Sequence, residues 1–275
     1  METLGVPDKY EAACSRPGTI ETFTYRVKGI RNGDEIEKTA LVYLPSSYSP
    51  ENQYNILYLV HGSGDNETSW FTKGHDKDVI DNLIFYGDIE PLIIVTPTLY
   101  YPDGFCSEPN EKPDSGYEQF AEELRHYLLP AVEAKYAGYA GGDVSEQNLI
   151  ETRTHRAMAG LSMGSMTTIN AGMMRSLDLF SWFGTFSGAH TEASDISAAL
   201  HSSEFEPYPI DYLLATNGKF DFLYKEHTET FKELERTEPK LTDGVNYSFI
   251  EIRNGSHDWP SWELALYDLL QILFR

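Results

Sequence analysis

The residues best suited to chemistry surround Ser162, which lies in the pentapeptide Gly160-Leu161-Ser162-Met163-Gly164. A G-x-S-x-G pentapeptide between a strand and a helix makes a sharp turn that exposes the serine hydroxyl beyond the end of the strand. Glycine is needed on both sides because side chains two residues before and after the serine would collide in that turn. The pattern predicts a nucleophilic serine, although it also fits a serine that merely caps a glycine-flanked helix.

A serine nucleophile needs a base to take its proton, and the base needs an acid to orient it. In α/β-hydrolases these residues follow one another in the order Ser, then Asp or Glu, then His, on loops after successive strands. His257 follows the strand-like run 247–253, and Asp221 follows the strand-like run 212–216. We therefore predict Ser162, Asp221 and His257 as a catalytic triad.

Other acids and another histidine are weaker candidates. Asp211 and Asp243 each precede a strand-like run, which would place them at the wrong end of the sheet. Asp258 adjoins His257, and adjacent side chains at such a position rarely point at each other. His227 lies within a helical stretch, where we expect it on a solvated face.

A transition-state oxyanion requires two backbone N–H donors, one of which comes from the residue after the nucleophile, here Met163. The second normally comes from the loop after an early strand, and HGSG at 61–64 follows the strand-like run 54–61. We predict Ser63 as the second donor, with an ordinary glycine-rich turn as the alternative. The resulting chemistry is two-step acyl transfer, which needs no metal and no cofactor.

The elements that must position these residues alternate between strands and helices. Asn32-Gly33 between the first two strand-like runs predicts an antiparallel hairpin, and Pro130 is expected to bend one helix. Strands are predicted at 21–27, 37–44, 54–61, 91–98, 156–161, 183–188, 212–216 and 247–253. Helices are predicted at 76–86, 115–136, 163–175, 225–236 and 261–274. This order indicates an α/β fold with a mostly parallel central sheet covered by helices on both faces, in a single domain over 1–275.

Composition narrows the class of partner. The chain has 275 residues, 41% of them hydrophobic, and a formal net charge of −22. Such a charge argues against binding to nucleic acid or to anionic membranes, which both require a basic face. No run of apolar residues is long enough to span a membrane. A neutral small molecule or an uncharged polymer is the compatible partner.

Four stretches together resemble carbohydrate esterase family 1, which includes feruloyl (cinnamoyl) esterases and acetylxylan esterases. They are HGSGDNETSW, PLIIVTPT, AGLSMGS and SHDWPSW, and they occur in the family order. The resemblance implies an α/β-hydrolase fold, with Ser162 as nucleophile, His257 as base and Asp221 as acid. Family members often have glycine where this chain has Ser165 and Asp65, and both positions are expected to border the pocket.

The resemblance implies a serine esterase that hydrolyses feruloyl or other hydroxycinnamoyl esters of plant arabinoxylan. The alternatives are an acetylxylan esterase, a sugar acyltransferase on the same scaffold, and a carbohydrate-binding module without activity. Five aromatic residues fall in loops expected near the active site and are predicted substrate contacts, unless they belong to the core: Trp70, Tyr100, Tyr101, Phe105 and Trp259. The segment 189–210 is expected either to cap the pocket or to form a surface insertion.

The sequence says less about the compartment in which the protein acts and about whether its cysteines are paired. The first twenty residues lack the basic start and the apolar stretch of a signal peptide. A role on plant cell walls implies an extracellular protein whose signal peptide is absent from this chain, with a cytoplasmic protein as the alternative. Cys14 and Cys106 could form one disulfide or remain separate thiols.

Overall fold

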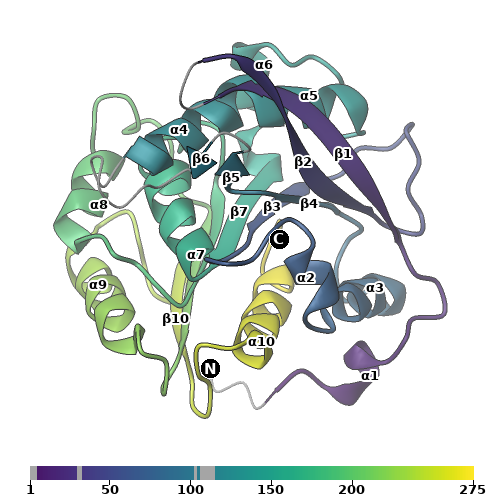
Figure 1. Cartoon of the computed structure of the whole chain (residues 1–275). Helices are drawn as coiled ribbons and strands as arrows, with labels where there is room; N and C mark the ends of the chain where they lie inside the picture. Colours follow the sequence, from purple (N-terminus) through teal and green to yellow (C-terminus); the bar gives the residue numbers. More distant parts are fainter. Residues whose placement is uncertain (1–4, 30–32, 102–103, 106–114) are drawn as a thin grey trace.

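A central sheet organises the computed structural model, which describes residues 5–29, 33–101, 104–105 and 115–275. Within these residues, eight strands pair in the order β1-β2-β4-β3-β7-β8-β9-β10 (Figure 1). Neighbours from β4 to β10 are parallel, whereas β2 is antiparallel to β1 and β4. The strands span Thr19–Lys28 (β1), Glu35–Leu44 (β2), Ile56–Val60 (β3), Ile93–Pro97 (β4), Arg156–Leu161 (β7), Trp182–Phe186 (β8), Tyr212–Gly218 (β9) and Tyr247–Ile252 (β10).

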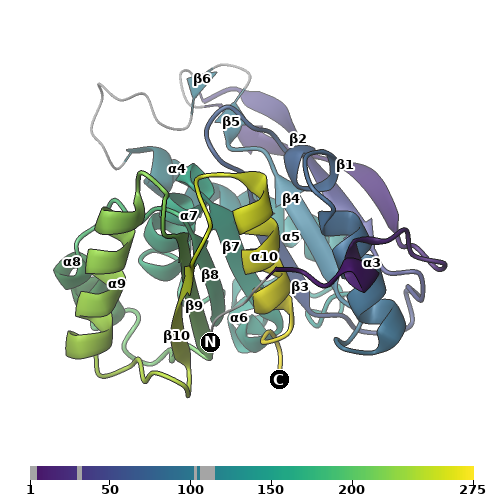
Figure 2. The ribbon, with the colours of Figure 1, turned by 90° about the horizontal axis from the view of Figure 1, so that it is seen from below.

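Helices cover both faces of this sheet, as the sequence predicts for an α/β-hydrolase fold (Figure 2). One face is packed by α4 (Ser115–Glu123), α5 (Leu129–Lys135), α6 (Glu146–Glu151), α7 (Met163–Thr167), α8 (Ala193–Leu200) and α9 (Tyr224–Thr237). The other is packed by α1 (Asp8–Glu11), α2 (Ser69–Thr72), α3 (Asp76–Tyr86) and α10 (Trp259–Leu270). The strands β3 and β4 are buried on both faces, which explains their continuous apolar sequence.

The predicted N-terminal hairpin is confirmed. Strands β1 and β2 pair in register from Thr19 opposite Leu44 to Lys28 opposite Glu35. The connection is longer than a two-residue turn, because Gly29 N donates to Asp34 O at 2.7 Å. Gly33 has a φ of +71°, a conformation that glycine adopts without strain. Asn32, the other predicted turn residue, lies outside the described residues.

The long helix predicted over 115–136 is interrupted earlier than the bend expected at Pro130. After α4, a π-helical turn spans Leu124–Leu128, and Pro130 lies in the first turn of α5. Proline has no backbone N–H and its ring clashes with the carbonyl of residue i−4, so the chain widens before it. A second π-helical segment, Thr168–Met173, follows α7 within the predicted helix 163–175.

The segment 189–210 contains a helix that the sequence analysis did not predict. Ile196 and Leu200 of α8 are fully buried, and Phe205 and Ile210 after it are almost so. These side chains belong to the same core as α9. The segment is therefore part of the packed fold and not a loose surface insertion, while a role in covering the pocket stays a prediction.

Two further sequence expectations concern membranes and cysteines. Among the helices of the described ranges, none combines the length and the apolar character that crossing a membrane requires. Within the described part of the chain, Cys14 has no disulfide partner. Cys106 lies outside the described residues.

Two carboxyl groups lie buried together where α3 begins. Asp76, the first residue of α3, is fully buried, and within the described residues neither of its carboxylate oxygens has a hydrogen-bond partner. A Cβ on Gly74 would lie 2.9 Å from both Asp76 Oδ2 and Glu263 Oε2, so the two carboxylates are neighbours. Burial, reinforced by the charge of Glu263, raises the pKa of Asp76 well above its usual range.

We expect Asp76→Asn to stabilise the protein at pH 7. A carboxyl group whose pKa is raised by folding opposes folding above its ordinary pKa, because the folded chain retains a proton that the unfolded chain releases. The melting temperature should rise by roughly 2–4 °C, which corresponds to about 1 kcal/mol for a domain of this size. The gain should vanish below about pH 4, where both states carry the proton.

Thermal unfolding at pH 7 and pH 4 measures this effect. Asp78→Asn is the matched control, because it removes one negative charge from the same helical turn at a position that is not buried. It should leave the melting temperature unchanged or lower it slightly. Equal gains in both variants would mean that general charge repulsion, and not the buried carboxyl pair, is responsible.

Candidate active site

Ser162 occupies a strained turn between β7 and α7. Its φ of 52° and ψ of −117° lie in a region that residues other than glycine rarely adopt. The turn is held by hydrogen bonds from Ser162 N to Phe186 O at 2.8 Å and from Met166 N to Ser162 O at 3.1 Å. Such strain persists only where the surrounding structure enforces it, and it is concentrated at functional sites.

Both flanking glycines are required by close backbone contacts. A Cβ on Gly160 would lie 2.5 Å from the carbonyl carbon and oxygen of Gly164. A Cβ on Gly164 would lie 2.4 Å from Val60 O, on the neighbouring strand β3. The collision expected from the sequence is therefore real, and it includes β3 as well as the strand and helix of the turn itself.

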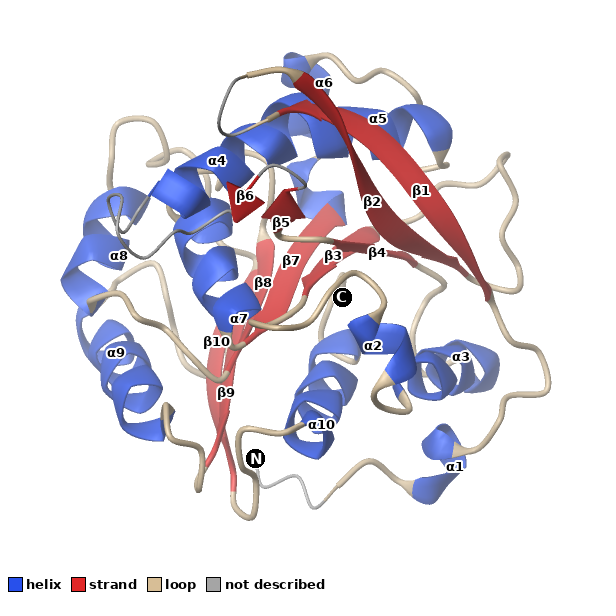
Figure 3. Ribbon diagram, in the orientation of Figure 1, coloured by secondary structure: helices blue, strands red, loops and turns tan. Residues whose placement is uncertain are grey.

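The structure brings the three predicted triad residues together. His257 Nε2 lies 3.0 Å from Ser162 Oγ, and His257 Nδ1 lies 2.8 Å from Asp221 Oδ2. The three residues follow β7, β9 and β10, and the parallel strands β7, β8, β9 and β10 are neighbours in that order in the sheet (Figure 3). With Nδ1–H donating to the carboxylate, Nε2 is free to accept the serine proton.

Asp221 is held as a carboxylate that orients the histidine. Its Oδ1 accepts a hydrogen bond from Leu223 N at 2.7 Å, while Oδ2 faces His257. Burial alone would raise the pKa of Asp221, but these hydrogen bonds outweigh burial and its pKa lies below the usual value. The group is therefore ionised at neutral pH and can stabilise a protonated His257.

Two glycines outside the predicted motifs let the acid and base loops touch. A Cβ on Gly218, at the end of β9, would lie 2.4 Å from the carbonyl carbon of Gly255. Phe220 N donates to Gly255 O at 2.9 Å, and Lys219 N donates to Ile252 O at 3.0 Å. These contacts join the two loops directly, and they hold Asp221 and His257 within reach of each other.

A buried histidine shapes the loop that carries the predicted oxyanion donor. His61 Nε2 accepts a hydrogen bond from Leu99 N at 3.0 Å, so Nδ1 carries the proton and donates to Gly62 O at 2.8 Å. Burial lowers the pKa of His61, which keeps the ring neutral in this role. Because the peptide is planar and trans, the N–H of Ser63 points away from the fixed Gly62 carbonyl.

The N–H groups of Ser63 and Met163 remain available to a ligand. The adjacent Gly64 N donates a hydrogen bond to Tyr100 Oη at 2.8 Å. The N–H of Ser63 makes no hydrogen bond within the described part of the chain. Met163 is the first residue of α7, where the N–H has no partner inside the helix. A Cβ on Gly62 would lie 3.3 Å from Ser162 Cβ, which places this loop beside the nucleophile.

The expectation that His227 lies on a solvated helix face is wrong. The side chain is fully buried, Nδ1 accepts a hydrogen bond from Gly188 N at 3.0 Å, and the ring packs on Phe231. Phe231 and Leu234 follow at positions i+4 and i+7, so this is the apolar face of α9. Burial lowers the pKa of His227 to about 3, and the residue is neutral and structural.

Two of the five predicted aromatic substrate contacts belong to the core. Trp70 is fully buried, and its Nε1 donates to Val60 O at 3.1 Å. Tyr101 is 5% exposed, and its hydroxyl donates to Glu123, which also pairs with Lys38. Neither side chain can reach a ligand from these positions, because polar groups deeper in the fold hold both of them.

The other three aromatic residues have different surroundings. Tyr100 is half-buried and stacks on His61 with ring centroids 5.5 Å apart, which supports the Ser63 loop. Trp259 is half-buried and contacts Trp70 edge-on at 5.4 Å. Both stay predicted substrate contacts. The side chain of Phe105 lies outside the described part of the chain.

Of the two positions that depart from the family pattern, Ser165 differs from the expectation that it borders the pocket. Ser165 is fully buried and donates to Gly188 O at 2.5 Å, so it supports the turn from below and does not border a pocket. Asp65 pairs with Lys73 in the loop after β3. Of the two, only Asp65 lies where it can influence a ligand through the Ser63 loop.

The other aspartates considered for the triad acid either have a structural role or lie far from His257. Asp258 caps α10 by accepting hydrogen bonds from Ser261 N at 3.2 Å and Ser261 Oγ at 2.6 Å. Asp211 precedes β9 at the end of the sheet away from Ser162. Neither competes with Asp221 for His257.

Phe222 was missed by the sequence analysis although it lies beside the base. Its side chain is 77% exposed, and its ring centroid is 4.3 Å from that of His257. The available signal was the pair of phenylalanines around Asp221 in the sequence KFDF. An exposed large apolar side chain is informative only when the structure places it next to a site.

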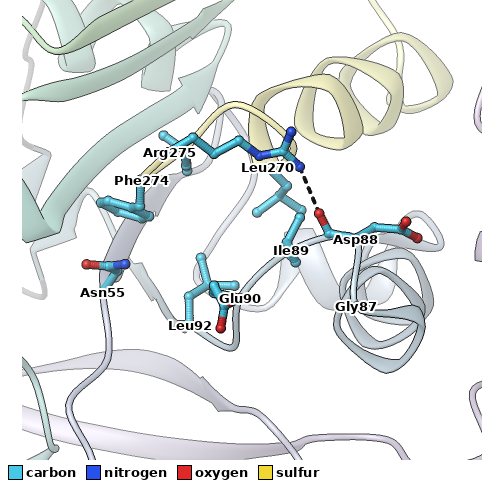
Figure 4. Close-up of a pocket in the computed structure, with 10 residues that line it drawn as sticks. Asn55, Gly87, Asp88, Ile89, Glu90, Leu92, Leu270, Phe274 and Arg275 are labelled. Carbon is cyan, nitrogen blue, oxygen red and sulfur yellow. Dashed lines mark hydrogen bonds between the residues drawn. The ribbon is translucent and has the colours of Figure 1, made fainter.

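A separate pocket lies at the opposite end of the sheet (Figure 4). It is lined by Asn55 and Leu92, which directly precede the parallel strands β3 and β4, and by the C-terminal residues Phe274 and Arg275. Arg275 donates to Asp88 O across it at 2.8 Å. Ligands of open α/β sheets bind beyond the carboxyl ends of the strands, where Ser162 lies, so this pocket is not the candidate site.

Comparisons with known proteins agree with this geometry. The chain matches the Esterase family over residues 35–272. It is 32% identical to endo-1,4-beta-xylanase Y from Acetivibrio thermocellus, over 98% of this chain and 24% of that protein. It is 28% identical to an endo-1,4-beta-xylanase/feruloyl esterase from Xylanibacter ruminicola, over 86% of this chain and 29% of that protein. The chain thus spans about a quarter of the length of these relatives.

A solved structure is similar over the whole chain. A mutant of the feruloyl esterase module from Clostridium thermocellum, in complex with sinapinate, superposes with a TM-score of 0.84 at 30% identity. The match covers 100% of this chain and 94% of that module. Fold, hydrogen-bonded triad and sequence similarity agree, and the chain belongs to the Esterase family.

Proposed function

We propose that this protein is a serine esterase that hydrolyses feruloyl and related hydroxycinnamoyl esters of arabinoxylan. The observation that carries the proposal is the Ser162–His257–Asp221 hydrogen-bonded chain, with contacts of 3.0 and 2.8 Å. The similarity to a module that binds sinapinate supports a hydroxycinnamoyl group on the acyl side. A polysaccharide substrate implies that the protein acts outside the cell.

In the first step, His257 Nε2 takes the proton of Ser162 Oγ as that oxygen attacks the ester carbonyl carbon. The N–H groups of Ser63 and Met163 receive the oxyanion, and the Asp221 carboxylate stabilises the imidazolium. The carbon–oxygen bond to the sugar then breaks, and His257 gives its proton to the departing oxygen. The acyl group remains on Ser162 as an ester.

In the second step, water replaces the sugar alcohol next to His257. The histidine takes a proton from water, which attacks the acyl carbonyl, and the same two N–H groups receive the second oxyanion. Collapse of this intermediate releases the hydroxycinnamic acid and returns the proton to Ser162. Every group needed for both steps belongs to this chain.

An ester panel tests the acyl preference. With methyl ferulate, methyl sinapate and methyl acetate, kcat/KM for the two aromatic esters should exceed that for the acetate at least about 10-fold, because burying an aromatic ring contributes about 1.5–3 kcal/mol. Acetylated xylan is the polymeric control. Release of acetate with no release of ferulate would make the protein an acetylxylan esterase.

A sugar acyltransferase would form the same acyl-enzyme on Ser162 in its first step. Adding xylo-oligosaccharides to the methyl ferulate reaction and separating the products by chromatography distinguishes the two fates of the acyl group. Free ferulate as the dominant product supports hydrolysis. A feruloylated sugar as the dominant product would instead identify an acyltransferase.

A further inference from the structure

An exposed aromatic ring stands beside the base and is not used by the two steps above. Phe222 is 77% exposed, and its ring lies at 4.3 Å and 47° to the ring of His257. It follows Asp221 by one residue, so the ring projects from the same loop that carries the acid. A large apolar side chain kept in water next to a reacting group indicates a surface that a ligand covers.

The position of Phe222 relative to Ser162 identifies which part of the substrate it meets. In the sheet order β3-β7-β8-β9, the loop with Ser63 follows β3, and the loop with Phe222 follows β9, on the other side of β7. The oxyanion therefore points toward β3 and away from Phe222. The departing oxygen must lie close to His257 Nε2 to receive its proton, so the alcohol part of the ester lies on the side of Phe222.

A groove continues from this ring along the surface. It runs along α9 and reaches the start of α8, and Phe222, Ala193, Glu226 and Thr230 are among its lining residues. Lys225 and Lys232 on α9 line it together with Glu229 and Glu233, so both signs of charge are present. Such a surface offers hydrogen-bond donors and acceptors to hydroxyl groups and favours a neutral polar ligand over an ion.

We propose that Phe222 and the adjoining end of this groove form a subsite for the sugar that carries the ester. The ring stacks on the apolar face of that sugar, and the groove side chains meet its hydroxyl groups. The inference rests on the proposed function, because a sugar alcohol must be the leaving group. It adds a specific residue that distinguishes a polysaccharide ester from a simple alkyl ester.

The experiment compares two substrates that share an acyl group and differ in the alcohol. They are methyl ferulate and a feruloylated arabinoxylo-oligosaccharide, and the readout is the ratio of their kcat/KM values. Phe222→Ala should lower this ratio, sugar ester over methyl ester, about 3- to 10-fold, as expected for the loss of one ring contact. The loss should appear mainly in KM for the sugar ester, and Phe222→Trp should restore the ratio.

Phe220→Ala is the matched control. Phe220 belongs to the same loop and is 70% exposed, but its backbone N–H binds Gly255 O and its ring has no contact with His257 among the described residues. In Phe220→Ala, the ratio of kcat/KM for the sugar ester to kcat/KM for the methyl ester should equal that of the wild type. An equal loss on both substrates in Phe222→Ala, or no change in the ratio, would overturn the sugar subsite.

Failure of the proposed function gives a different result. A wild-type protein that hydrolyses neither feruloyl ester would contradict the esterase itself. A wild-type protein that hydrolyses both esters, with a ratio insensitive to Phe222, would leave the esterase in place and remove only the subsite.

Discussion

Replacing Ser162 with alanine is expected to abolish ester hydrolysis, with kcat falling at least about 10⁴-fold and up to about 10⁶-fold. The variant loses the only oxygen that the geometry places 3.0 Å from His257 Nε2 within the described residues. The backbone N–H groups of Ser63 and Met163 remain, so some binding of substrate should survive. Initial rates on methyl ferulate measure the loss, and calorimetry of sinapinate binding checks that the site is intact.

Ser46→Ala is the control for this substitution, since Ser46 is exposed in the loop after β2. Its rate should match that of the wild type. A Ser162→Ala variant that retains more than about 1% of the rate would show that another residue carries the acyl group.

Replacing Asp221 with asparagine is expected to lower kcat by about 10⁴-fold at neutral pH while the fold is preserved. An asparagine amide can donate to His257 Nδ1, which would move the imidazole proton to Nε2. That nitrogen could then no longer accept the proton of Ser162. The loss comes from the wrong tautomer of His257, and it is measured as kcat on methyl ferulate.

Asp258→Asn is the matched control, because Asp258 adjoins His257 and also carries a negative charge. Asparagine caps helices about as well as aspartate, so α10 should begin as before. We expect this variant to keep its rate within about threefold. Similar losses in both variants would mean that negative charge near His257, and not the hydrogen bond to Nδ1, supports catalysis.

The parts of the site that could be predicted from the sequence are those with a local signature. The turn at Ser162 requires glycine at fixed offsets, and Gly160 and Gly164 meet Val60 and each other at distances that no other residue allows. Asp221 and His257 could be chosen because each follows a strand in the order that this chemistry uses. Parallel strands then bring their carboxyl ends together without further information.

The residues whose burial could not be predicted from the sequence are those that pack against distant segments of the chain. The sequence predicts loops for Trp70 and Tyr101, but they lie in the short helix α2 and in the two-residue strand β5 (Tyr100–Tyr101). Val60 O and Glu123 bind their polar atoms in the interior. His227 has the helical position expected for it, yet its face of α9 turns toward Phe231 and the core. The sequence shows the helical periodicity of apolar residues, but it does not show which other elements pack against each face of the helix.

The contact between the acid and base loops illustrates the same limit. Gly218 and Gly255 are 37 residues apart in sequence, and neither belongs to a recognised motif. Only the structure shows that a Cβ on Gly218 would meet Gly255 at 2.4 Å. Phe222 is similar, since its meaning comes from the 4.3 Å between its ring and that of His257.

The most direct test of the account is mass spectrometry of the protein after brief reaction with methyl ferulate followed by acid quenching. We expect a single feruloyl adduct on the peptide that contains Ser162, and this adduct should disappear on longer incubation as the acyl-enzyme is hydrolysed. The His257→Ala variant should show no adduct at the same time point. Ferulate release by the wild type with an adduct on a different residue, or with the same rate in Ser162→Ala, would contradict the central claim.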